Sequence, residues 1–520
     1  MRRTIGRIGG ALGLLGALAA TAAAPAGEGD AVAPALTVEF VRPDRQAEAV
    51  LDLFRGSRAA SPATAMASWR RATGDHEGPG KAAQAVMALF NPETAREWRA
   101  IHGASLAIGL DADGRPRWSA AIPRDDGEIA ALVASLRLSG GSDETPTPEG
   151  WPVRRLGGPG APLAVVAPSG GVALAGDRAD LDAAVARLAL RETPDDADGF
   201  HLALRPELLP SPAPAAWARP VAAIRASGLL NASGVVGLRD DSLDLDLASE
   251  IAPAKTALLD VPPIDPAWLS WLPAEAEAAV ALSAGRGPAF WDALFELADR
   301  VDRADPAREG LQPLRARLNL MALIRGVRPE VDLWPLVRGV AAGTFADESG
   351  TPGAVAAIVA GSPEEAERIF RRVVLPMAPL LGGRPGAGTD PGAVVAIGRA
   401  SGMPVEAATR GSTVLIGWGE GALDRALKSA ETPDRSVAAL VSIDGRAAGR
   451  VGVFRPRLGA ATRLIDRAPA LAATLAEAAP VIWRGGWDGG RAWDVVRWGD
   501  LRRVVARFLE RVPQAPPEAP

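Results

Sequence analysis

Two stretches of the chain match each other in order and spacing, and this limits its possible folds more than any other feature. Residues 160–188 align without a gap to residues 402–430, at a shift of 402 − 160 = 242. The matched positions include Gly160/Gly402, Pro162/Pro404, Val172/Val414, Leu181/Leu423, Asp182/Asp424 and Ala184/Ala426. A repeat of this length predicts one fold used twice. It predicts no reaction.

A second matching block lies upstream, at a shift of 339 − 103 = 236. Its matched positions are Gly103/Gly339, Asp111/Asp347, Gly114/Gly350, Ile122/Ile358 and Glu128/Glu364. The change of shift between the two blocks requires small insertions, which we expect in loops. A chain of 520 residues has room for two large domains, or for three of about 150 residues each.

Hydrophobic periodicity gives both copies the same kind of elements. The expected strands are 37–41, 105–110, 117–123, 278–283 and 354–360, with another that ends near Phe345, and the expected helices are 46–54, 127–136, 178–188, 287–301, 363–374 and 420–429. Ser362, with Glu365 three residues later, is the expected N-cap of one helix. A hairpin is expected over 235–251, where Leu243, Leu245 and Leu247 alternate with Asp244 and Asp246.

Strands joined by short turns are antiparallel, so the fold class expected is α+β, with helices covering one face of each sheet. We expect two related modules of antiparallel sheet with packed helices, plus a C-terminal hairpin and helix. The expected division is 1–26 signal peptide, 27–207 first module, 208–277 linker and acidic hairpin, 278–440 second module, 441–510 Trp-rich hairpin and closing helix, and 511–520 disordered tail.

The N-terminus has the pattern of a secretory signal peptide. Arg2, Arg3 and Arg7 precede a short apolar run, and Ala22 and Ala24 offer an A-x-A cleavage site, with Ala24 and Ala26 as candidate last residues of the signal peptide. We therefore expect an exported protein, periplasmic or extracellular after cleavage, with an uncut membrane anchor as the alternative. The Arg2-Arg3 pair also permits a twin-arginine export route.

Composition excludes several classes of chemistry. The chain has no cysteine, which excludes disulfides, thiolate metal sites, cysteine nucleophiles and a lipid-modified cysteine. A formal net charge of −5 gives no reason to expect a nucleic acid partner. No segment after the signal peptide is apolar for long enough to predict a transmembrane segment in the mature chain.

The signal peptide, the two α+β copies, the segment LPAEAEAAVAL (272–282) and the closing Gly/Trp hairpin with its helix carry a resemblance at the level of pattern. In these features the chain is similar to a bacterial family of exported, internally duplicated proteins of unknown function. The resemblance covers most of the mature chain. It implies a duplicated α+β fold and export, and it transfers no catalytic residue.

Motifs for cofactors and metals are weak. Gly417, Gly419 and Gly421 lie between a predicted strand and a predicted helix, but their spacing favours a tight turn over a dinucleotide site. The histidines His76, His102 and His201 lack metal-ligand spacing, although Asp75-His76-Glu77 could form a partial site. The sequence predicts no cofactor and no metal site.

Catalytic motifs are equally sparse. No G-x-S-x-G occurs, and Ser169 has no partner that the sequence identifies. The densest acidic cluster is Asp240, Asp241, Asp244 and Asp246, where weak Ca²⁺ binding is the alternative to an ordinary wet strand face. Alternation with leucine places Asp244 and Asp246 on the solvent side.

Four tryptophans near the C-terminus are the candidate partner-binding residues: Trp483, Trp487, Trp493 and Trp498. Exposed indoles stack on sugars or anchor protein partners, whereas packing within the terminal hairpin and helix is the structural alternative. The last predicted helix, which begins at Asp500, is basic and amphipathic. We expect it to pack on the hairpin rather than lie on an anionic membrane.

These observations favour an exported, non-catalytic binding or scaffolding protein of the cell envelope, with an envelope protein or a glycan as partner. The alternative is an envelope hydrolase that acts on glycan or peptide through carboxylates, with its site in a cleft between the two modules.

Overall fold

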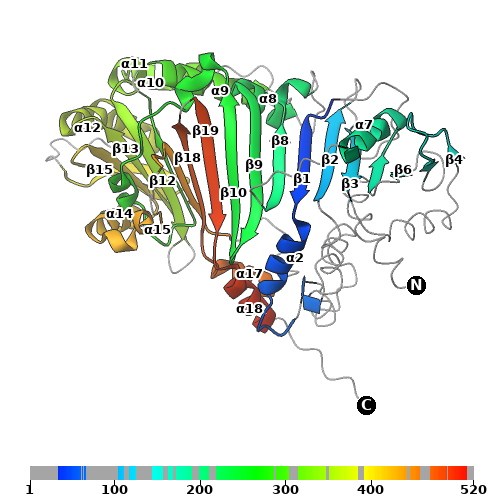
Figure 1. The fold of residues 1–520 in the computed structure, drawn as a ribbon. Coiled ribbons are helices and arrows are strands. Elements are labelled where there is room, and N and C mark those ends of the chain that lie inside the picture. Colours follow the sequence, from blue (N-terminus) through cyan, green and yellow to red (C-terminus); the bar gives the residue numbers. More distant parts are fainter. Residues whose placement is uncertain are drawn as a thin grey trace.

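A computed structural model shows one large antiparallel sheet flanked by helices (Figure 1). It is an α+β fold, as the sequence predicts. The described residues are 33–59, 61–62, 64–65, 103–110, 116–123, 143–155, 162–167, 171–189, 198–209, 218–285, 288–303, 314–346, 351–383, 392–441, 446–456, 469–488 and 490–511. The signal peptide, the helix expected over 127–136, Ser169 and the Asp75-His76-Glu77 segment lie outside them.

Two runs of strands have the same spatial order. In the first half the order is β4–β5–β6–β7–β3–β2–β1–β8–β9–β10, and in the second it is β14–β15–β16–β13–β12–β11–β17–β18–β19. Chain order gives β1 Leu36–Val41, β2 Gly103–Leu110, β3 Pro116–Ile122, β4 Asp143–Glu144, β5 Val153–Arg155, β6 Leu163–Val166, β7 Val172–Ala175, β8 Gly199–Leu204, β9 Leu229–Arg239, β10 Ser242–Ile251, β11 Ala278–Ser283, β12 Val337–Ala346, β13 Pro352–Ala360, β14 Val395–Ala400, β15 Met403–Arg410, β16 Thr413–Trp418, β17 Arg450–Phe454, β18 Val481–Asp488 and β19 Arg491–Trp498.

Strand β10 pairs with β19, and this pairing joins the halves into one sheet. Asp246 lies opposite Val495 at its centre. The two residues hold the same place in their hairpins, because both hairpin registers give a shift of 249 (Ser242 corresponds to Arg491). The junction is therefore two-fold symmetric, about an axis through the Asp246–Val495 pair.

Strand registers test the spacing found in the sequence. Ser105 pairs with Ala121 and Gly339 with Val359, which reproduces the shift of 236 for β2–β3 against β12–β13. For β7 against β16 the shift is 242, again as in the sequence. For β6 against β15 the gapless alignment is wrong by one: Leu163 corresponds to Glu406, since 406 − 163 = 243. Five residues separate Val166 from Val172, one more than the four that separate the corresponding Thr409 and Val414.

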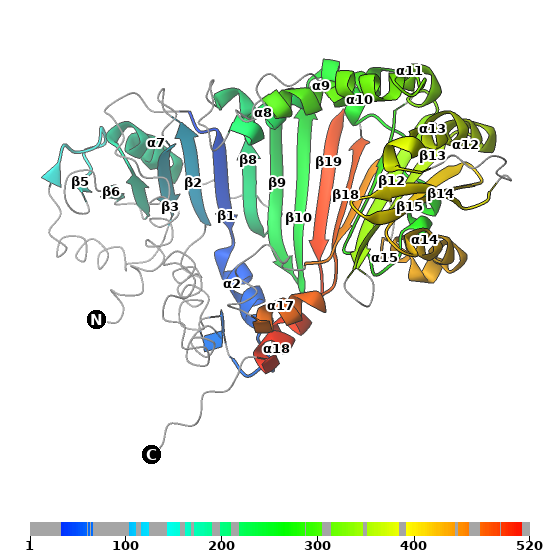
Figure 2. The same cartoon turned by 180° about the vertical axis from the view of Figure 1, so that it is seen from behind.

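Helices lie along the edges and ends of the sheet (Figures 1 and 2). Four of them, α8, α9, α10 and α11, lie at one end of the strands, while α2, α17 and α18 lie at the opposite end. Their bounds are α2 Pro43–Asp52, α7 Arg178–Ala189, α8 Ala218–Ala226, α9 Pro288–Arg303, α10 Leu314–Leu323, α11 Pro329–Asp332, α12 Pro363–Ile369, α13 Leu375–Met377, α14 Ala422–Glu431, α15 Val437–Leu440, α17 Pro469–Ala476 and α18 Leu501–Arg511. Five 3₁₀ segments and one π-helical segment complete the described helical structure: η1 Pro206–Leu208, η3 Pro253–Leu258, η4 Pro266–Trp271, η6 Phe370–Val374 (the π-helical one), η7 Ala378–Leu381 and η8 Pro433–Arg435.

The sheet has two faces that differ in character. We call face A the side that carries Phe200, Leu245, Val496 and Trp483, which the strand registers place together. Face B is the opposite side, which carries Asp246 and Val495.

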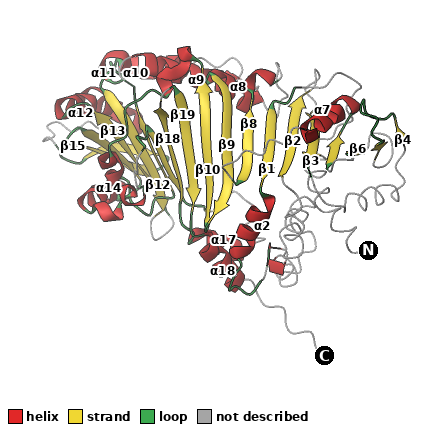
Figure 3. Ribbon diagram, in the orientation of Figure 1, coloured by secondary structure: helices red, strands yellow, loops and turns green. Residues whose placement is uncertain are grey.

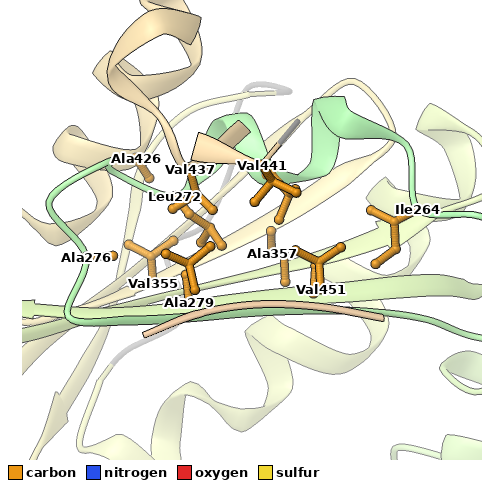
Figure 4. Packing of buried hydrophobic residues seen from close by; sticks show 14 of the residues in the cluster. Ile264, Leu272, Ala276, Ala279, Val355, Ala357, Ala426, Val437, Val441 and Val451 are labelled. Atoms are coloured by element: carbon orange, nitrogen blue, oxygen red, sulfur yellow. The ribbon is translucent and has the colours of Figure 1, made fainter. Parts of the chain in front are cut away.

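At the β12–β16 end of the sheet, helices cover both faces, so the expectation of helices on one face was wrong there. One core packs on face B beneath η4, α14 and α15 and includes Leu272, Ala357 and Leu415 (Figure 4). The other core packs on face A with α9, α12 and η6 and includes Trp291, Ile369 and Val414. Two cores form here because strands such as β16 carry buried side chains on both sides.

The middle of the sheet is not covered by helices in the described residues. Figures 2 and 3 show β9, β10 and β19 bare between the helical ends. The hairpin expected over 235–251 forms these central strands β9 and β10. No cleft separates the halves there, since β10 and β19 are paired directly.

Two sequence predictions about the starts of helices are confirmed. Ser362 caps α12, and its Oγ accepts a hydrogen bond from the Glu365 amide at 3.2 Å. Gly419 and Gly421 form a tight turn from β16 to α14 with φ of 103° and 63°, values that favour glycine. Helix α18 packs against α2 through buried Leu501, with Leu53 and Leu238 in the same cluster.

Candidate binding face

A continuous apolar row crosses the centre of face A. Laterally paired residues place these side chains next to one another on eight neighbouring strands: Phe40, Phe200, Val236, Leu245, Val496, Trp483, Gly452 and Val280. The row spans about 34 Å at the usual spacing between strands. Phe40 and Phe200 stack at one end, with ring centroids 4.1 Å apart.

Large apolar side chains on this face remain open to solvent. Five of them, each from a different strand, have exposed fractions of 36–40%: Phe200, Leu243, Leu282, Val340 and Phe454. All five lie on face A, by the same strand registers. Contiguous apolar exposure on a folded protein marks a surface that binds something.

One charged pair lies beside the apolar row, on β17 and β19. Arg450 Nη2 donates to both Asp494 carboxylate oxygens at 3.1 Å, and the two side chains are 13% and 23% exposed. Trp483 Nε1 donates to Asp494 Oδ1 at 2.9 Å. The pair passes over Gly485, where a Cβ atom would lie 2.1 Å from Asp494 Oδ1 and 2.7 Å from Arg450 Nε. The charges therefore neutralise each other within the face.

The four candidate tryptophans do not form one cluster. Trp483 lies in the apolar row, and Trp487 is half-buried on the same face. Trp498 is also on face A but packs with the α2–α18 cluster, and its Nε1 donates to the Ala479 carbonyl at 3.1 Å. Trp493 is on face B, 8% exposed within a core, with the Arg446 guanidinium 5.5 Å from its ring centre.

Face B is polar at its centre. Asp246 is exposed there, as the alternation predicts, but Asp244 is buried with an exposed fraction of 6%. The expectation for Asp244 was wrong because Arg497 of β19 covers it, with Nε donating to Oδ1 at 2.8 Å. His201 lies on β8 of this face, between Glu39 and Val235.

A cavity of about 590 Å³ lies between α9 and α10. Its lining is charged and includes Asp292, Glu296, Arg300 and Arg315. Arg315 Nη2 donates to Glu330 Oε2 at 2.8 Å, and Arg315 also pairs with Asp292. These hydrogen bonds raise the pKa of Arg315, and the bond from Arg315 lowers the pKa of Glu330. Carboxyl groups held in their ionised form suit ion pairing better than acid catalysis.

The described residues offer neither a metal-ligand cluster nor a long apolar helix. There, no group of three His, Asp or Glu side chains is arranged to hold a metal ion. Across the same part of the chain, no helix has both the length and the apolar character needed to cross a bilayer.

Comparisons with known proteins give little guidance. No family model and no curated protein matches the chain. Solved structures of TP0453 show weak similarity: crystal form IV has 9% sequence identity over 44% of this chain and 83% of that chain, with a TM-score of 0.24. Crystal form III has 10% identity over 45% and 86%, also with a TM-score of 0.24. Similarity this low supports no conclusion about fold or function.

The residues that form the candidate face were only partly foreseen. Trp483 was predicted as a binding residue, whereas Phe40, Phe200 and Val280 were not. The available signal was the alternation in each strand, which gives the two sides of a strand but not which strands are neighbours.

Proposed function

We propose that this chain is an exported, non-catalytic binding protein of the cell envelope, built from two copies of one unit. In this proposal, face A holds an extended apolar ligand, and the acyl chain of an amphiphile is the ligand class that fits best. The observation that carries the proposal is the uninterrupted apolar row from Phe40 to Val280.

Support for the two copies comes from topology. Nine strands in each half follow one spatial order, and the sequence shifts of 236 and 242 recur as strand registers. Equivalent helices also fall between equivalent strands: α7 and α14 follow β7 and β16, while α8 and α17 precede β9 and β18.

Polar groups on face A argue for an acyl chain over a glycan. A sugar needs hydrogen-bonding partners beside the aromatic ring on which it stacks. Beside Trp483, however, Arg450 and Asp494 bond each other, and the indole N–H is taken by Asp494. An acyl chain needs only an apolar surface to pack against, and the row supplies one about 34 Å long.

The hydrolase alternative has less support. It needs a carboxylic acid whose pKa is raised into the working range. Glu330, which bonds Arg315 of the charged cavity, has a lowered pKa instead. In the cavity itself, Asp292 and Glu296 are paired with Arg315 and Arg300.

The test uses two adjacent valines as a matched pair. Val495 and Val496 are neighbours on β19, both half-buried, and they point to opposite faces. We expect the chain of residues 27–520 to bind a fluorescent acyl-chain probe that palmitate displaces. Val496→Asn should weaken that binding by about tenfold, because it places an amide in the row, while Val495→Asn leaves it unchanged.

Two results would overturn the proposal. One is a wild-type chain that binds no acyl probe although its circular dichroism is that of a folded protein. The other is equal loss of binding in both valine variants, which would make the effect one of general stability. If sedimentation showed a dimer broken only by Val496→Asn, face A would instead be an interface between copies of the chain.

A further inference from the structure

The most exposed large apolar side chains of the described residues are not on the sheet. They are Leu320, Leu323 and Ile324 at the end of α10, with exposed fractions of 53%, 64% and 70%. Their spacing of three and four residues places them in one stripe along the helix. Exposing such a stripe to water is unfavourable, and a partner that covers it lowers the free energy.

The opposite side of α10 is held firmly to the protein. Arg315 pairs with Glu330 and Asp292, and Asn319 Nδ2 donates to Glu330 Oε1 at 3.2 Å. Ala322 is 7% exposed and packs inward on the same side. The stripe therefore points outward because the helix is anchored by its other side. Figure 1 places α10 at the outer rim of the molecule, beside α11.

Charges next to the stripe are basic. The stripe is followed by Arg325 and Arg328, and the sequence has no aspartate or glutamate from 314 to 328. Arg328 follows the stripe directly and its side chain is 69% exposed. Arg368 and Arg328 both approach the single carboxylate of Asp332, at 3.6 and 4.0 Å, so one positive charge is left over there.

We propose that the tip of α10 docks the protein onto an anionic lipid surface. The apolar stripe inserts among the acyl chains near the headgroups, and Arg325 and Arg328 contact lipid phosphates. Charge complementarity selects this partner, because arginines flanking a protruding apolar stripe match the headgroup layer of an anionic bilayer. The inference does not depend on ligand binding at face A.

The experiment measures co-sedimentation of the chain of residues 27–520 with two kinds of vesicle. One is pure phosphatidylcholine, and the other contains about one third phosphatidylglycerol, an anionic lipid. Wild type should bind the anionic vesicles more tightly. The double variant Leu323→Gln/Ile324→Gln should weaken that binding by about tenfold or more, since two inserted side chains lose their burial. Arg325→Gln/Arg328→Gln should remove the preference for anionic lipid.

Controls separate docking from other effects. Leu230→Gln changes a side chain with a similar exposed fraction, 51%, on β9, and it should bind vesicles like wild type. The proposal is overturned if wild type ignores both vesicles, as a stripe meant for a protein partner would, or if the double variant binds as well as wild type.

Discussion

Equivalent positions in the two halves hold opposite chemistry at the centre of face A. In the first half, Phe200, Val236 and Leu245 lie side by side on β8, β9 and β10. The corresponding strands of the second half, β17, β18 and β19, place Arg450, Gly485 and Asp494 there. The same strand order therefore carries an apolar trio on one side of the junction and a bridged ion pair on the other.

A neighbouring position shows a swap of size. Leu202 lies beside Gly234 in the first half, whereas Gly452 lies beside Trp483 in the second. The glycine lies on β9 in the first half and on β17 in the second. A Cβ on Gly234 would lie 2.4 Å from Leu247 Cδ2, and a Cβ on Gly452 would lie 2.6 Å from Phe454 Cε2. A Cβ on Gly452 would lie 2.9 Å from Trp483 Cε3. Large side chains from different strands therefore fill the space beside these two glycines.

The largest expected effect comes from giving the second half one residue of the first. Gly485→Val should lower the free energy of unfolding by about 3 kcal/mol, because its Cβ would overlap the Arg450–Asp494 pair. The triple variant Arg450→Phe/Gly485→Val/Asp494→Leu should recover most of that loss, since it transplants the whole apolar trio. Urea denaturation measures both, and a triple variant no more stable than Gly485→Val would break the equivalence of the two halves.

A smaller effect is expected from breaking the ion pair alone. Asp494→Ala leaves Arg450 and the Trp483 indole N–H without their acceptor. We expect a loss of about 2 kcal/mol, below the full cost for a buried pair because Asp494 is 23% exposed. Leu245→Ala, the equivalent change in the first half, removes only apolar contacts. The informative measurement is the salt dependence of unfolding, which should change in Asp494→Ala and stay as in wild type for Leu245→Ala.

The smallest effect concerns α9–α11, which belong to the second half. The Arg315 hydrogen bond lowers the pKa of Glu330 below its ordinary value of 4.5. A lowered pKa in the folded state adds stability above the unfolded value and loses it as the pH falls through the folded value. Glu330→Gln should therefore cost a few tenths of a kcal/mol at neutral pH and flatten the stability curve below about pH 4.5, since this surface pair is screened by solvent. Identical acid limbs for variant and wild type would contradict this.

Local pattern predicts the elements well and their neighbours poorly. The strands 278–283 and 354–360 were predicted almost to the residue, because alternation and turns are local signals. The position of β10 beside β19 was not predicted, since its paired residues, such as Leu243 and Trp498, are far apart in the chain. The burial of Asp244 was missed for the same reason: its cover, Arg497, comes from that distant strand.

The four candidate tryptophans show how the length of one turn decides which side chains share a face of the sheet. Asp488 pairs with Arg491, so residues of odd number on β18 share a face with residues of even number on β19. Trp483 and Trp487 therefore share a face with Trp498, and Trp493 takes the other one. Turn length alone separates Trp493 from the rest, whereas the burial of Trp498 under α18 needs the tertiary structure.

The symmetric pairing of β10 with β19 bears on how such a sheet avoids aggregation. An unpaired last strand displays a full ladder of amide and carbonyl groups, a template for any other strand. Here each half closes the other's open ladder, through a contact of the self-complementary kind that two-fold dimers use. A single half made alone would expose that ladder, and its best available partner would be a second copy of itself.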